Sequence, residues 1–412
     1  MTSSAAVHPI RRFMGPGTTE SAIFALSLLT GPIVSRALGD DGRGAVAAVI
    51  VPVQLLTWVF MLGIPYGSAM LVNELPKRRI VDSTWRIALV VNVPVAIVGW
   101  FAAPLLLDTH PDEVVTWFRV GMLCVILGLP ATSAIHHRMI ATGGTWRTSL
   151  AINAHLLGYS VAVVVLALVG ELTLTTTLCA WIGSLVAASA LVVVVYGAVP
   201  HGLADAETAR RLFRTGRPNA AVTLATVSLG RLDQVFLAVL GTSASLGHYA
   251  IAVTTAQISV PVTNGIASVV LPDAFAKSGG GVERTAIRFV FALSLAIALL
   301  SAVTAPWLLP WVFGRDFEPS VGLLWLLLPG QVLFNTAWVC SAGQLGRGEG
   351  SDAVRTIGLA ALVSTVMLAP AIHLFGAAGA AALTSVCQGL FLGGVLRARR
   401  RRQVASTTEV LV

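Results

Sequence analysis

The sequence contains few charged side chains. Of its 412 residues, 11% are Asp, Glu, Lys or Arg and 56% are apolar, whereas an ordinary soluble domain has roughly 25% charged residues. This deficit of charge excludes a soluble enzyme of this size. Apolar segments long enough to cross about 30 Å of hydrocarbon cover about two thirds of the sequence, which predicts a polytopic membrane protein.

Cysteine is also scarce. Cys124, Cys179, Cys340 and Cys387 lie singly within apolar segments, and no C-x-x-C pair is present. This pattern excludes a disulfide framework and gives no indication of a metal site. The sequence also lacks the glycine-lysine loop that binds ATP phosphates and the motifs of zinc peptidases and serine hydrolases. We therefore expect a protein that is not an enzyme and has neither cofactor nor bound metal.

The apolar segments number twelve. They span about 13–35, 45–72, 84–107, 114–135, 148–169, 178–199, 218–240, 247–271, 286–309, 321–343, 354–375 and 377–396. Sequences such as VAVVVLALVG at 161–170 are apolar on every side, which is typical of lipid-embedded helices and differs from the alternation of barrel strands. The predicted fold class is all-α with twelve transmembrane helices.

Basic residues fall on alternate loops. If the N-terminus is inside, 22 of the 27 Lys and Arg lie on the cytoplasmic side, whereas acidic residues divide almost evenly. This positive-inside bias predicts a multi-pass protein of the plasma membrane with both termini in the cytoplasm. The basic tail RARRRR at 397–402 is then expected to lie near anionic headgroups, so the net charge of +8 does not indicate a nucleic-acid partner.

The chain shows signs of an internal duplication. Leu38-Gly39 followed by Gly44 matches Leu240-Gly241 followed by Gly247, and two further loop pairs recur at offsets of 206 and 208 residues. Two pseudo-symmetric six-helix bundles around a central cavity are therefore predicted. The predicted divisions are an N-terminal bundle at 1–200, a cytoplasmic linker at 201–217, a C-terminal bundle at 218–396 and the basic tail at 397–412.

Four ionisable residues lie inside the predicted spans: Glu20, Arg119, Arg231 and Asp233. Each costs about 2.5–3.5 kcal/mol on insertion scales, so such residues usually face a bundle interior or a wet cavity. Arg119 is close enough to a span end for its side chain to extend to the headgroups. Arg231 and Asp233 are about 200° apart around a helix, so they serve different faces.

Polar residues also recur on single faces of two neighbouring spans. Asp233 continues a face of small and polar residues, and Gln257 and Asn264 belong to a matching face in the next span. Such faces permit either close helix packing or the lining of a polar cavity. The size of these three side chains favours the cavity. Interhelical hydrogen bonds are the expected role of Asn92, Asn153, His155, Gln331 and Asn335.

Four segments resemble those of polysaccharide-biosynthesis flippases, a branch of the superfamily that also contains multidrug exporters and lipid II flippases. They are residues 35–49, 231–253, 270–277 and 312–330, and the resemblance extends from about 15 to 396. It implies transfer of a polyprenyl-diphosphate-linked oligosaccharide between leaflets of the bilayer by alternating access. The implied partners are this lipid-linked glycan, the bilayer, glycosyltransferases and a polysaccharide polymerase.

The resemblance makes Arg231 and Asp233 the leading substrate-binding residues, followed by Glu20, Gln257 and Asn264. An arginine suits a diphosphate because its planar fork forms charge-assisted hydrogen bonds.

An ion-coupled multidrug antiporter remains an alternative function, because Glu20 is an acid that can take up a proton or sodium. Three further alternatives fit the sequence less well. A lipid II flippase usually has two spans more than the twelve predicted here and several arginines in its cavity. A glycan polymerase or ligase needs a substantial outer loop, which this sequence lacks, and a purely structural protein does not need buried charges such as Arg231 and Asp233.

Overall fold

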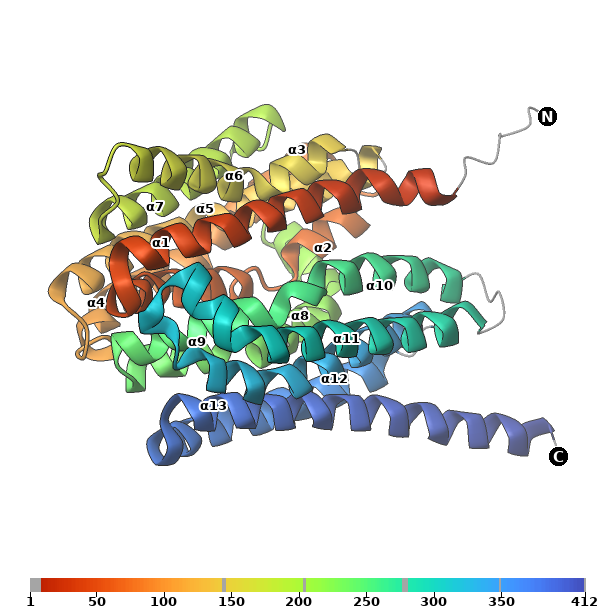
Figure 1. Ribbon diagram of the computed structural model, residues 1–412. Coiled ribbons are helices and arrows are strands. Elements are labelled where there is room, and N and C mark those ends of the chain that lie inside the picture. The colour runs from red at the N-terminus through yellow and green to blue at the C-terminus, as the bar shows by residue number, and fades with distance from the viewer. Residues whose placement is uncertain (1–8, 143–145, 203–204, 276–280, 348–349, 411–412) are drawn as a thin grey trace. The chain divides into compact units, whose positions relative to one another are not determined.

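The computed structural model describes the backbone of residues 9–142, 146–202, 205–275, 281–347 and 350–410. Side chains are described for residues 29–135, 150–151, 153–202, 205–217, 220–267, 270, 283–344, 347, 351–352 and 354–401. Within these ranges the regular structure is helical and no strand is present (Figure 1). The all-α fold class is therefore confirmed.

Short connections join the helices. In chain order they are α1 (Pro9–Val59), α2 (Ile64–Met70), α3 (Lys77–Ile87), α4 (Val93–Leu106), α5 (Asp112–Thr142), α6 (Trp146–Leu168), α7 (Leu174–Val195), α8 (Ala206–Leu240), α9 (Ser243–Ala256), α10 (Val260–Phe275), α11 (Gly281–Phe313), α12 (Ser320–Gly346) and α13 (Gly350–Val410). A π-helical turn, Ala88–Asn92, joins α3 to α4, and a 3₁₀ turn, Gln257–Ser259, joins α9 to α10.

Two of the longest helices are each interrupted by a glycine. Gly39 in α1 has φ 68° and Gly376 in α13 has φ 59°, which is a left-handed conformation that glycine adopts without steric cost. Each of these helices therefore consists of two helical parts that meet at a kink. Both kinks lie in the short gaps that the sequence places between predicted spans, 35–45 and 375–377.

The described part of the chain contains eight helical stretches that are long and apolar enough to cross a membrane. They are Leu29–Val59, Lys77–Leu106, Asp112–Ile135, Leu174–Val195, Ala220–Leu240, Glu283–Phe313, Ser320–Gln344 and Val354–Arg401. Helix α6 adds a shorter apolar stretch, Asn153–Leu168. The chain is a multi-pass membrane protein, while the number of twelve spans remains a prediction.

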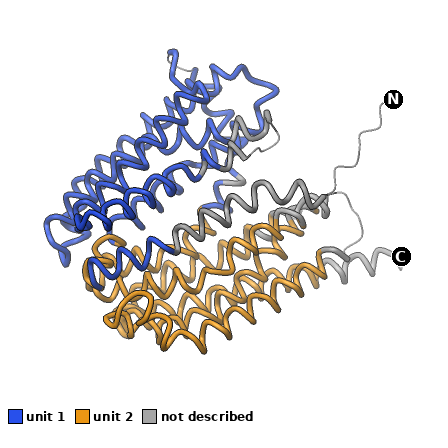
Figure 2. The backbone as a smooth tube through the Cα atoms, turned by 45° about the horizontal axis from the view of Figure 1, so that its top comes forward, with its two compact units in different colours: residues 1–39, 48–223 blue, residues 40–47, 224–412 orange. Residues whose placement is uncertain are grey.

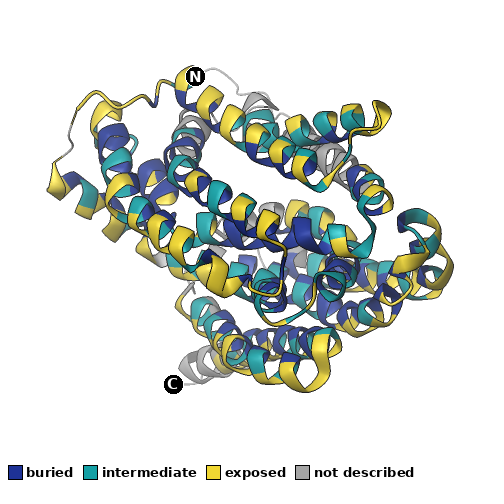
Figure 3. Cartoon of the chain, turned by 90° about the vertical axis from the view of Figure 1, so that its left-hand side faces the viewer, coloured by how far each residue is buried: buried dark blue, intermediate teal, exposed yellow. Residues whose placement is uncertain are grey.

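Exposed residues lie along the helices as well as at their ends (Figure 3). Many of them are large and apolar. Phe101, Leu105, Leu168, Trp307 and Phe375 are each more than 70% exposed. Apolar exposure on this scale marks an interaction surface, because an aqueous surface rarely tolerates it. Hydrocarbon in contact with these helices accounts for it.

The chain forms two compact units (Figure 2). Unit 1 consists of residues 1–39 and 48–223, and unit 2 consists of residues 40–47 and 224–412. Two helices therefore contribute to both units: α1 gives residues 40–47 to unit 2, and α8 passes from unit 1 to unit 2 after Thr223.

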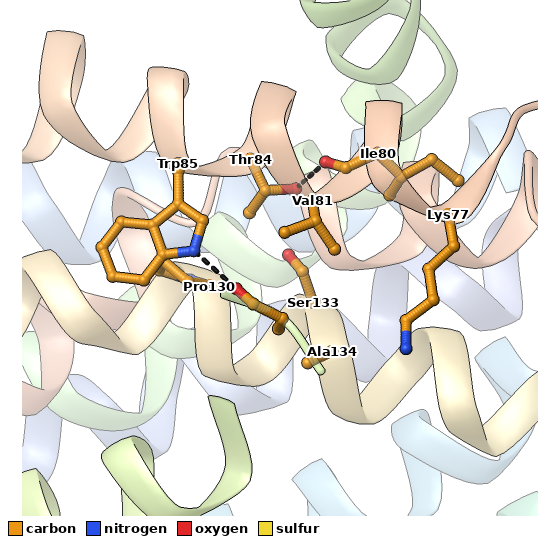
Figure 4. A pocket seen from close by; sticks show the side chains of 9 residues that line it. Lys77, Ile80, Val81, Thr84, Trp85, Pro130, Ser133 and Ala134 are labelled. Atoms are coloured by element: carbon orange, nitrogen blue, oxygen red, sulfur yellow. Dashed lines mark hydrogen bonds between the residues drawn. The ribbon is translucent and has the colours of Figure 1, made fainter. Parts of the chain in front are cut away.

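Unit 1 is built around α5, which packs against α2, α4 and α7. Three hydrogen bonds fasten α3 to the segment that follows α7. Lys77 Nζ donates to the Tyr196 carbonyl (2.6 Å), Trp85 Nε1 donates to the Ala198 carbonyl (2.7 Å), and Asp82 Oδ1 accepts the His201 N–H (2.8 Å). A small apolar pocket lies beside these bonds, with Trp85 and Thr84 both already hydrogen-bonded (Figure 4).

The start of α8 is capped by a side chain. Asp205 Oδ1 accepts the Thr208 N–H (2.5 Å) and its Oδ2 accepts the Thr208 hydroxyl (3.0 Å), which satisfies helix N–H groups that have no partner within the helix. Arg211 pairs with Glu74, and Leu212 is fully buried in the unit 1 core. Much of the predicted linker at 201–217 is therefore the ordered first part of α8.

Unit 2 is built around α12, which packs against α9, α10, α11 and α13. Its apolar core includes Leu229, Ala337, Cys340, Cys387 and Phe391. At one end of these helices Glu283, whose side chain is 6% exposed, pairs with Arg347 and, at 3.4 Å, with Arg399. This cluster joins the start of α11 to the ends of α12 and α13.

Two glycines bring α1 and α9 into backbone contact within unit 2. A Cβ atom added to Gly44 would lie 1.6 Å from the Ser243 carbonyl oxygen, and one added to Gly247 would lie 2.2 Å from the Asp40 carbonyl oxygen. Each glycine thus faces the carbonyl four residues before the other glycine. The contact is reciprocal, and its two partners are the first pair of loops matched in the sequence.

Candidate functional site

Asp233 lies at the centre of a buried hydrogen-bond cluster in unit 2. Its Oδ2 accepts the Tyr249 hydroxyl (2.6 Å) and the Thr384 hydroxyl (3.1 Å), and its Oδ1 accepts the Gln234 N–H (2.8 Å). Helices α8, α9 and α13 supply these groups, and Asp233 is only 4% exposed. Among the described residues no Lys or Arg forms an ion pair with this carboxylate.

A small polar pocket adjoins this carboxylate. Its polar lining comprises Asp233, Gln257, Gln331, Thr384 and Gln388. The Oε1 atom of Gln388 is buried and has no hydrogen-bond partner in the described structure. Carboxylate and amide oxygens are ligands for hard cations, and an acid surrounded by hydroxyls can also take a proton. The pocket can therefore hold a proton or a small monovalent cation.

A divalent metal site is not supported by the described residues. No group of three or more His, Cys, Asp or Glu side chains is placed to hold an ion there. One carboxylate leaves half of the charge of a divalent ion uncompensated, and in an apolar interior that is costly. This further favours a singly charged occupant for the pocket at Asp233.

A second polar network lies in the same unit. Asn335 Nδ2 donates to the hydroxyls of Ser259 (2.8 Å) and Ser294 (3.0 Å), and Gln331 Nε2 donates to Asn335 Oδ1 (2.9 Å). In unit 1, Asn92 Nδ2 donates to the Val125 carbonyl (3.0 Å). These bonds confirm the predicted interhelical role of Asn92 and Asn335. Because its amide groups are paired, the Asn335 network stabilises helix packing.

The predicted site residues are only partly brought together. Asp233 and Gln257 line the same pocket. Arg231 is half-buried and lines no part of that pocket, and Asn264 is exposed. The Arg231 side chain forms no salt bridge or hydrogen bond with the described residues, although its charge interacts with that of Asp233. Glu20 lies in α1, and its side chain is outside the described residues. A role for these residues in substrate binding remains a prediction.

The sequence alone does not point to three residues of the cluster: Tyr249, Thr384 and Gln388. Tyr249 lies in the segment 231–253, which resembles the family and contains one of the duplicated loops, and neither feature marks its hydroxyl. Thr384 and Gln388 are four residues apart in an apolar stretch, so they share one face of α13. That spacing is the signal that would have found them.

Three of the family-like segments meet at another place in unit 2. His248 Nε2 lies 3.2 Å from Asp40 Oδ2 and 2.9 Å from the Asp316 carbonyl oxygen. The His248 ring also contacts Phe317 edge-on, with a centroid separation of 5.9 Å. Residues 35–49, 246–249 and 312–319 are thus joined through one imidazole. This clustering gives the three segments a shared structural role.

A family model described as polysaccharide biosynthesis protein matches residues 18–277. No curated protein matches the sequence significantly. The fold does match solved structures. An inward-facing multidrug resistance MATE family transporter of the MOP superfamily has a TM-score of 0.76 at 15% identity, and the match covers 94% of this chain and 96% of that one.

Two further solved structures share the fold. The lipid II flippase MurJ in an inward closed conformation has a TM-score of 0.72 at 10% identity, covering 93% of this chain and 87% of that one. A MOP superfamily transporter from Pyrococcus furiosus has a TM-score of 0.64 at 17% identity, covering 95% of each chain. The TM-scores establish a common fold. At identities this low, the substrate has to be argued from the residues.

Proposed function

Because the chain belongs to the polysaccharide biosynthesis protein family, we propose that it transfers a polyprenyl-diphosphate-linked oligosaccharide across the plasma membrane for cell-surface polysaccharide synthesis. The family match over residues 18–277 is the observation that chiefly supports this substrate. The shared fold with a lipid II flippase and with multidrug transporters supports movement of the substrate by alternating access.

The proposed architecture has twelve spans in two related bundles. The eight apolar helices become twelve if α1 and α13 each form two spans at their kinks and if α6 and the α9–α10 pair also cross. The reciprocal contact of Gly44 and Gly247 supports a duplication, because two-fold relations generate such mutual contacts. The bundles at 1–200 and 218–396, with both termini cytoplasmic, complete the proposal.

The proposed mechanism separates the substrate from the coupling ion. Arg231 pairs with the diphosphate, since its guanidinium has no ion pair among the described residues and a planar fork suits phosphate oxygens. Asp233 binds the proton or monovalent cation whose gradient drives transfer. Gln257, Asn264 and Glu20 complete the polar lining that the glycan passes.

An ion-coupled multidrug antiporter is the second candidate function. The solved multidrug transporters share the fold of this chain, and a buried acid such as Asp233 suits ion coupling in either protein. The two functions differ in cargo. An antiporter expels lipophilic cations, whereas a flippase exposes a lipid-linked glycan.

Leaflet transfer in proteoliposomes tests the proposal. A fluorescent polyprenyl-diphosphate oligosaccharide is placed in vesicles, and an impermeant quencher reports its exposure with and without proton, sodium or voltage gradients. We expect transfer by the wild type and at least a tenfold loss in Arg231→Ala. Arg119→Ala is the matched control, since Arg119 already donates to the Trp100 carbonyl (3.1 Å) and lies over that ring.

Absence of transfer by the wild type under every gradient would overturn the flippase. Gradient-dependent efflux of cationic dyes by the same vesicles would then favour the antiporter. Equal transfer by the wild type and by Arg231→Ala would retain the flippase and show that the diphosphate binds elsewhere.

A further inference from the structure

Unit 1 contains a larger cavity that is separate from Asp233. Helices α1, α5, α6 and α7 line this cavity with Gln54, Trp58, Met61, His155 and Ser189 among others. A second, smaller pocket shares Trp58 and Met61 with the first and extends to Tyr66. We call the two neighbouring pockets together the Trp58 cleft.

The Trp58 cleft combines aromatic faces with polar groups that are free to bind. Trp58 is 47% exposed and Tyr66 is 43% exposed, so both rings present area to an occupant. The side chains of Gln54 and His155 line the cleft without a hydrogen bond to any described residue. An amide and an imidazole each offer both a donor and an acceptor, which suits an occupant that also carries both.

Charge is missing from the lining. Among the described residues of both pockets there is no Asp, Glu, Lys or Arg. A lipophilic cation would find no counter-charge in the cleft, and a diphosphate would find no Lys or Arg. A hydrocarbon tail would leave Gln54 and His155 unsatisfied away from water, which is costly. An uncharged polyol with an apolar face meets all of these conditions.

We infer that the Trp58 cleft is a saccharide-binding subsite for the glycan of the lipid-linked substrate. Trp58 packs against the apolar C–H face of one sugar ring, while Gln54, His155 and Ser189 hydrogen-bond with its hydroxyls. The inference rests on the proposed function and adds a place for the glycan within unit 1. Sugar recognition is thereby separated from the charged residues of unit 2.

Binding measurements in nanodiscs test this subsite. The probes are a fluorescent polyprenyl diphosphate carrying a neutral tetrasaccharide and the same polyprenyl diphosphate without sugars. Loss of an aromatic stacking partner weakens binding by up to about tenfold. We expect Trp58→Leu to bind the glycosylated probe about tenfold more weakly and the bare probe unchanged. Trp58→Phe should stay within about threefold of the wild type.

Trp307→Leu is the matched control, because Trp307 is 71% exposed and lines neither pocket; it should bind both probes like the wild type. Gln54→Leu should reproduce the selective loss and gives a second test if Trp58→Leu unfolds, which thermal unfolding reports. Equal weakening of both probes would assign the cleft to the lipid. No weakening in either variant would also overturn the subsite. A wild type that binds neither probe would defeat the proposed function itself.

Discussion

The carboxylate of Asp233 is held by donors from three different helices. Its hydroxyl and backbone donors satisfy it, and among the described residues no basic side chain forms a salt bridge with it. Arg231 acts on it only through its charge, so no direct positive partner has to be displaced when the carboxylate takes up a proton or a cation. A residue of this kind has a testable consequence for coupling.

We predict that Asp233→Asn keeps the fold and abolishes the effect of the driving gradient. Asn retains an acceptor for the Tyr249 hydroxyl but has no charge to titrate or to bind a cation. Transfer measured with and without the gradient should become equal and fall to the undriven rate of the wild type. A variant that still accelerates when the gradient is applied would remove Asp233 from the coupling step.

A second prediction at this scale concerns pH and Asp205. The Thr208 backbone N–H, followed by the Thr208 hydroxyl, lowers the pKa of the Asp205 carboxyl. A depressed pKa means that the cap stabilises the fold above the unfolded pKa of about 4 and that this contribution is lost as the pH falls through the folded pKa. Asp205→Ala should therefore unfold earlier than the wild type at pH 7.

The stability difference between Asp205→Ala and the wild type should shrink as thermal unfolding is repeated toward pH 3. Asp205→Asn is the control, since Asn caps helices without a titrating group. Between pH 7 and pH 3 the stability of Asp205→Asn should fall less than the stability of the wild type. If the stability difference between Asp205→Ala and the wild type were the same at every pH, the ionised carboxylate would be excluded as the source of the stabilisation.

At the scale of elements, the crossing of α1 and α9 depends on the absence of side chains. We predict that Gly44→Ala disrupts it, because the new Cβ would lie 1.6 Å from a backbone oxygen that cannot rotate away. Overpacking of this kind costs about 1–3 kcal/mol or more. Thermal unfolding in detergent should reveal the loss, and Gly247→Ala should behave alike.

Gly358→Ala in α13 provides the comparison, since nothing lies within 4 Å of the added Cβ. Replacing a helical glycine in open space should be neutral or stabilising by up to about 1 kcal/mol. Equal destabilisation by Gly44→Ala and Gly358→Ala would mean that the helix crossing has no special steric demand.

Much of this element structure follows from sequence alone. Hydropathy locates the apolar helices, and the glycines at 39 and 376 lie in the gaps between predicted spans. The pocket around Asp233 is predictable only in part. Asp233 and Gln257 stand out as large polar groups in apolar spans, whereas Gln388 becomes a neighbour of Asp233 through the packing of α13 against α8, which no local pattern encodes.

For the whole molecule, the proposed twelve spans predict which residues face outward. A cysteine placed at Asp41, in a background without the four native cysteines, should react with an impermeant maleimide added to intact cells. This position is exposed and adjoins the kink at Gly39. Glu207→Cys, at the start of α8, should react only after the membrane is permeabilised. Labelling of Glu207→Cys in intact cells, or none at Asp41, would contradict this topology.

Residues 40–47 lie early in the chain but belong to unit 2, so their contacts can form only late in synthesis. These residues pack against α9, whose first residue is Ser243, so about 200 further residues must be made before their contacts can form. At about 5–20 residues per second this delay is roughly 10–40 s. Until then the segment from Asp40 to Ala47 lacks its partner in α9, so unit 2 cannot be completed before the second half of the chain is made.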